Sequence, residues 1–130
     1  MKVKVLLIIN AVIATLYGII MLLIPSQFGS MYGFNATPEL IFVSRLLGLY
    51  LFATGLLSWL IKDAPSSEPR RAVLFSFLAM DVLGFVVTLI YQLNGVVNAT
   101  GWSSVVVYLL LGIGFAYLLF AKPASPQERR

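Results

Sequence analysis

The chain has 130 residues, of which 60% are hydrophobic and 11% are charged, with a net charge of +4. A soluble domain of this size could not bury so much apolar surface, so the composition predicts a one-domain integral membrane protein. Cysteine and histidine are absent, which excludes thiol chemistry, the common zinc and copper sites and nucleophile–histidine pairs. We therefore expect no cofactor and no metal.

Four apolar segments are long enough to cross a hydrocarbon core of about 30 Å. We expect them to be helices, because an open sheet would leave backbone N–H and C=O groups without hydrogen bonds in lipid. The segments are residues 5–24, 40–61, 72–93 and 102–121. The predicted fold class is an all-α membrane protein, a four-transmembrane-helix bundle over residues 1–121 with a polar tail over 122–130. The first segment resembles a signal peptide, but it is longer than a typical h-region, so we expect it to be retained.

The basic residues predict the orientation of these spans. Eight of the nine precede the first span, lie between the second and third, or follow the fourth, whereas loops 25–39 and 94–101 contain no Lys or Arg. The positive-inside rule therefore predicts that both termini, the middle loop and the tail are cytoplasmic. The expected location is the cell membrane, with the bacterial inner membrane preferred, as a multi-pass protein. Because the basic residues flank apolar segments, we expect no nucleic-acid partner.

Arg45 is the one basic residue that topology does not explain. On straight helices it lies about 8 Å below the outer edge of the hydrocarbon, and Asp81 lies about 14 Å above the inner edge. A charge at that depth is expected to face protein or water. We therefore predict an inward-facing Arg45 that contacts Asp81, Tyr17 or Glu39, with Asn10 close to Asp81.

Asp81 begins a polar stripe along one face of its span, because Gly84, Thr88 and Gln92 follow at helical spacing. Such stripes leave three interpretations open: a hydrogen-bonded seam between helices, a functional polar cavity, or a subunit interface. The candidates for a polar interior or a binding site are Arg45, Asp81, Asn10, Tyr17, Tyr50 and Thr88.

The order of several residues resembles that of small bacterial four-span membrane proteins. Pro25, Phe28 and Tyr32-Gly33 are followed by the motif SRLLG over residues 44–48, and later by a span with Asp and Gly. Among named groups the chain is similar to the DoxX-like family. This resemblance implies diverse roles, including association with oxidoreductase complexes. No catalytic residues carry over, and without cysteine a redox role would be accessory.

A non-enzymatic accessory or structural membrane component is the preferred functional interpretation, since no reaction-capable set of residues stands out. Its expected partners are the lipid bilayer and either a second copy or a membrane complex. One alternative is a small transporter that uses Asn10, Arg45 and Asp81. A second alternative is a membrane enzyme on a lipidic substrate, with Asp81 as the acid or base.

Overall fold

The computed structural model describes residues 2–121, which form four long helices and two short ones. The elements in chain order are α1 (Val3–Leu23), α2 (Pro25–Met31), α3 (Pro38–Ile61), α4 (Glu68–Leu93), the 3-10 helix η1 (Ala99–Gly101) and α5 (Trp102–Phe120). Four helical segments, the last of them including η1, are long and apolar enough to cross a membrane. The prediction of an all-helical chain with four helices suited to span a membrane is therefore confirmed. The predicted tail over 122–130 lies outside the described residues.

Helices α3 and α4 begin two and four residues before the apolar segments predicted for them, because polar residues cap their first turns. The Thr37 side chain accepts a hydrogen bond from the Leu40 amide at 3.1 Å, and Pro38 occupies the first turn of α3. Ser67 accepts in the same way from the Arg70 amide at 3.3 Å. Since capping satisfies amides that the helix leaves free, each helix extends into its polar flank.

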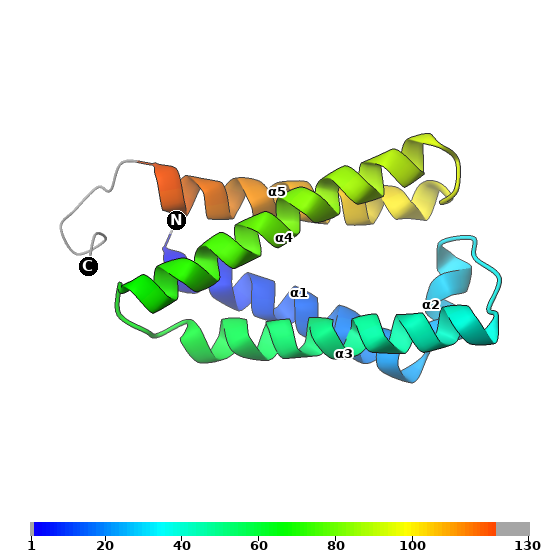
Figure 1. Ribbon diagram of the computed structural model, residues 1–130, viewed down its shortest axis with the longest axis horizontal. Coiled ribbons are helices and arrows are strands. Elements are labelled where there is room, and N and C mark those ends of the chain that lie inside the picture. The colour runs from blue at the N-terminus through cyan, green and yellow to red at the C-terminus, as the bar shows by residue number, and fades with distance from the viewer. Residues whose placement is uncertain (1, 122–130) are drawn as a thin grey trace.

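The long helices form two pairs (Figure 1). Helix α1 packs along α3, and α4 packs along α5, whereas α1 and α5 share a smaller contact and α3 and α4 form no comparable interface. The α3–α4 connection lies at the same end of the molecule as the start of α1 and the end of α5. Helix α2 and the α4–α5 connection lie at the opposite end. We call these the connection end and the α2 end.

Small residues bring α1 and α3 together. Gly18 of α1 and Gly48 and Gly55 of α3 lie in this interface, where a Cβ atom would meet the backbone of the opposite helix. The buried hydroxyl of Ser58 also donates to the Leu7 carbonyl of α1 at 2.6 Å. Close backbone approach with a polar bond across the interface is typical of helix association in membranes.

The two pairs meet at the connection end and diverge toward the α2 end (Figure 1). The buried core that joins them combines residues from the start of α1, the first half of α4 and the second half of α5. Its members are Leu6, Leu7, Leu74, Phe77, Leu111, Phe115 and Leu119. This cluster closes the connection-end half of the bundle and leaves the other half for a cavity.

The connection end carries the described basic residues apart from Arg45. There Asp63 pairs with Lys4 at 2.8 Å and with Lys62 at 2.9 Å, which ties the start of α1 to the α3–α4 loop. Hydrogen bonds from Lys4, and then from Lys62, lower the pKa of the exposed Asp63 carboxyl to about 2. In the described chain, the loops at the α2 end hold no Lys or Arg, so the two ends differ sharply in charge.

Candidate functional site

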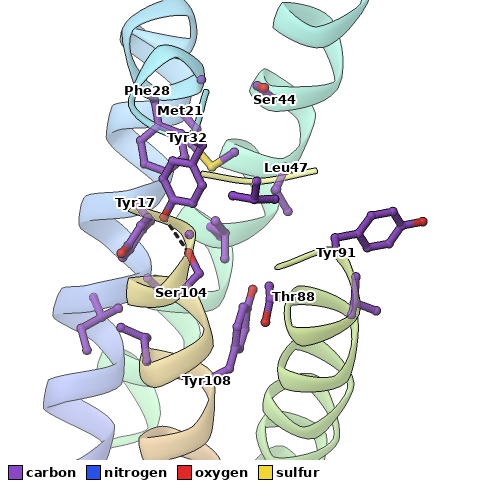
Figure 2. Close-up of a pocket in the computed structure, with 18 of the residues that line it drawn as sticks. Tyr17, Met21, Phe28, Tyr32, Ser44, Leu47, Thr88, Tyr91, Ser104 and Tyr108 are labelled. Carbon is purple, nitrogen blue, oxygen red and sulfur yellow. Dashed lines mark hydrogen bonds between the residues drawn. The ribbon is translucent and has the colours of Figure 1, made fainter. Parts of the chain in front are cut away.

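A cavity of about 370 Å³ lies between the two helix pairs in the α2-end half of the molecule. Every element of the described chain contributes to its walls, and most of the lining is apolar. Figure 2 shows side chains from α1, α2, α3, α4 and α5 around this space. Its size is within the range of small-molecule sites in proteins.

Asn10 of α1 and Asp81 of α4 form the floor of the cavity. They are 3% and 2% exposed, and each lies about one turn beyond a member of the buried core, Leu7 and Phe77 respectively. Among the described residues, the Asn10 Nδ2 and Asp81 Oδ2 atoms are buried without a hydrogen-bond partner. Unpaired buried polar groups of this kind are costly and uncommon in native proteins, so these two atoms set the floor apart from the apolar walls.

A third buried atom without a partner, Gln92 Oε1, belongs to a side chain with a structural role. The Gln92 amide nitrogen donates to the carbonyls of Val97 and Asn98 at 3.3 and 2.9 Å. Its oxygen packs against Gly101, where a Cβ would collide with it. Gln92 therefore fastens the α4–α5 loop, and its oxygen is covered by the chain itself.

The cavity has a side rim between α3 and α4. Four of its lining residues are also about half exposed on the outside of the molecule: Val43, Leu47, Val87 and Tyr91. The first two lie on α3 and the others on α4, and in Figure 2 the Tyr91 ring points away from the cavity. Because α3 and α4 do not pack closely, this rim opens sideways, toward the lipid chains around a membrane-spanning bundle.

Aromatic side chains close the α2 end of the cavity. Tyr17 meets Phe28 edge-on at 5.8 Å between ring centroids, and Phe28 lies 5.0 Å from Tyr32. The Tyr32 hydroxyl is 2.6 Å from the Ser104 hydroxyl of α5 (Figure 2). The Asn98 side chain also donates to the Met31 carbonyl at 3.1 Å. These bonds fasten α2 to the second helix pair, and we call them the α2 latch.

Removing one bond of the α2 latch tests its contribution. We expect Tyr32→Phe to destabilise the α2 end by about 1 kcal/mol, the usual net value of one hydrogen bond. Hydrogen exchange in detergent or nanodiscs should then be about fivefold faster in the amides of α2. The control is Ser30→Ala, which removes only a local bond to the Ser26 carbonyl. Equal effects of the two substitutions would contradict a latch.

Arg45 does not take the inward position that the sequence predicts. It is exposed, it lines no part of the cavity, and neither ion pair found among the described residues includes it or Asp81. Its neighbour Ser44 faces the interior, and one residue further along a helix turns by about 100°, which carries Arg45 to the outer side of α3. The long stem of Arg can lie along lipid while its head reaches the interface.

Tyr50 is a second correction, because its side chain is 67% exposed and lies outside the cavity. The other four candidates, Asn10, Tyr17, Asp81 and Thr88, do line it. Thr88 bonds within its own helix, to the Gly84 carbonyl at 2.7 Å. The sequence prediction missed Ser104 and Tyr108 of α5, and the spacing of four residues from Ser104 through Tyr108 to Gly112 was the available signal.

No group of three or more acidic residues that could hold a metal ion occurs within residues 2–121. Comparisons with protein-family models, with curated proteins and with solved structures found no match. The resemblance to the DoxX-like family stays a prediction.

Proposed function

We infer that this protein is a non-enzymatic component of a bacterial cell membrane that holds a lipophilic molecule in the cavity between its helix pairs. The observation that carries this proposal is a mostly apolar cavity whose floor has two unpartnered polar atoms, Asn10 Nδ2 and Asp81 Oδ2. Apolar walls with a few convergent polar groups are typical of small-molecule sites. An accessory role fits this arrangement, since a carboxyl and an amide alone provide no reaction-capable set.

Binding is better supported than permeation. The cavity ends at Asn10 and Asp81, and the buried core around Phe77 and Phe115 closes the molecule beyond them. A transport path would need to continue to the connection end. The transporter interpretation also required Arg45 in the interior, and this side chain lies on the outside of α3.

Blocking the side rim tests the binding proposal. We expect Leu47→Trp to fill the rim and to lower labelling of the cavity walls by a photoreactive alkane in nanodiscs about tenfold, equivalent to 1.4 kcal/mol. The matched control is Leu49→Trp, since Leu49 is almost as exposed as Leu47, at 48% against 47%, lies on the same helix and does not line the cavity. Mass spectrometry of the labelled peptides would locate the probe. Equal effects of Leu47→Trp and Leu49→Trp on labelling of the cavity walls would refute the proposal.

The proposed orientation places both termini and the α3–α4 loop in the cytoplasm. It is supported by the contrast between the basic connection end and the α2 end. Because the chain has no cysteine, single cysteines can report the side of each loop. We expect Val96→Cys to react with a membrane-impermeant maleimide in intact cells and Ser66→Cys to react only after lysis. The reverse pattern would show the opposite orientation.

A further inference from the structure

We propose that the ligand of this cavity is a neutral lipophilic alcohol, whose hydroxyl group sits between Asn10 and Asp81 and whose apolar part extends toward the side rim. This inference rests on the proposed function and adds the chemistry of the polar head. It follows from which atoms at the floor lack partners, from what surrounds them, and from the shape of the space above them.

The two unpartnered atoms are of complementary kinds. Asn10 Nδ2 is a hydrogen-bond donor, and Asp81 Oδ2 belongs to a carboxyl group. No hydrogen bond within the described chain satisfies either atom, so a ligand head that accepts from one and bonds to the other would complete both. A hydroxyl group can do this in either state of the acid, because it donates to a carboxylate and accepts from a carboxylic acid.

Charged heads fit this floor less well. An anion such as a phosphate would face the Asp81 carboxyl, and within residues 2–121 no basic side chain lines the cavity to compensate. An ammonium group could pair with Asp81, but it has only donors and would leave the Asn10 N–H unsatisfied. The floor also lies deep between spanning helices, where an additional charge is expensive to bury.

The space above the floor suits an apolar tail. Between Asp81 and Gln92 the cavity follows α4 for about 16 Å, at a rise of 1.5 Å per residue. Apolar side chains such as Ile13, Leu51 and Val107 line this part. The rim between α3 and α4 gives such a molecule a route from the bilayer, so that the alcohol need not cross the closed α2 end.

The test is competition against the photoreactive alkane in nanodiscs by compounds that share one hexadecyl chain. The competitors are hexadecanol, hexadecyl methyl ether, hexadecane and hexadecylammonium. We expect hexadecanol to compete about tenfold better than hexadecane, and the methyl ether, which accepts a hydrogen bond but cannot donate one, to match the alcohol only where Asp81 is protonated. Asp81→Leu and Asn10→Leu should each reduce this ratio to about twofold or less, while Asp81→Asn, which keeps a donor and an acceptor, should retain part of it.

The variants remain informative because labelling by the alkane probe shows whether the cavity is still present. Unchanged labelling by the probe in Asp81→Leu would show that the cavity persists while the preference for the alcohol is lost. Equal competition by all four compounds would overturn the alcohol inference and leave the proposed function standing. Strongest competition by hexadecylammonium would replace the alcohol with a cation. Absence of cavity labelling by any probe would overturn the proposed function as well.

Discussion

Gly18→Ala should destabilise the protein by about 1–3 kcal/mol, the usual range for inserting a carbon atom into a well-packed interior. A Cβ at Gly18 would lie 2.6 Å from the Phe52 amide nitrogen and 2.7 Å from the Gly48 carbonyl oxygen. Both atoms belong to the backbone of α3, so no side-chain rotation can relieve the clash. Helices α1 and α3 would have to separate. Thermal unfolding in detergent, followed by circular dichroism, would measure the loss.

The matched control is Gly112→Ala on α5. A Cβ there would meet only the Asp81 Cβ at 3.6 Å, an ordinary contact. This substitution should leave stability unchanged or raise it slightly, because alanine restricts the unfolded chain more than glycine does. If the two substitutions lowered the unfolding temperature equally, close packing of α1 on α3 would not be the cause.

Asp81→Leu should stabilise the empty protein, by about 1–3 kcal/mol. The Asp81 carboxyl is 2% exposed, and one of its oxygens has no partner in the described chain. Removing an unsatisfied buried polar group recovers its desolvation penalty, and the adjoining cavity leaves room for a leucine side chain. The same unfolding measurement, made on delipidated protein, would detect the gain. A gain of this kind is expected where a polar group is kept for binding rather than for stability.

Asp81→Asn is the control for this prediction, because it preserves size and polarity. We expect its stability to lie close to that of the unaltered protein, so that the gain is specific to loss of the polar group. A loss of stability in both variants would instead mean that the Asp81 carboxyl has a stabilising partner in the membrane-embedded protein.

The number and approximate extent of the spanning helices were predictable from the sequence, because a bilayer requires about twenty apolar residues per span. The first residues of α3 and α4 were harder to predict. Their first turns contain Glu39 and Glu68, and an apolar-length criterion omits such residues. Thr37-Pro38 and Ser67 preceding Pro69 were readable start signals, and they mark the observed beginnings more closely.

The rotation of each helix about its axis was harder to predict, and this accounts for the errors at the site. In a soluble helix the polar face points outward, but here both the buried and the lipid-facing sides are apolar. Asp81 could be placed because Gly84 and Thr88 share its face. Arg45 offered Gly48 as a neighbour, yet Gly48 packs against α1 and Arg45 lies outside. Polarity alone therefore did not determine which way a charged residue faced.

The α2 latch joins residues far apart in the chain, and this has a consequence for biogenesis. Each helix pair is built from neighbouring spans, so α1 and α3 can associate while the ribosome is still synthesising α5. The bonds from Tyr32 to Ser104 and from Asn98 to Met31 span 72 and 67 positions. They can form only after the last span has entered the bilayer. Until that moment the cavity lacks the wall that α5 provides, so the complete cavity is assembled only in the last step of insertion.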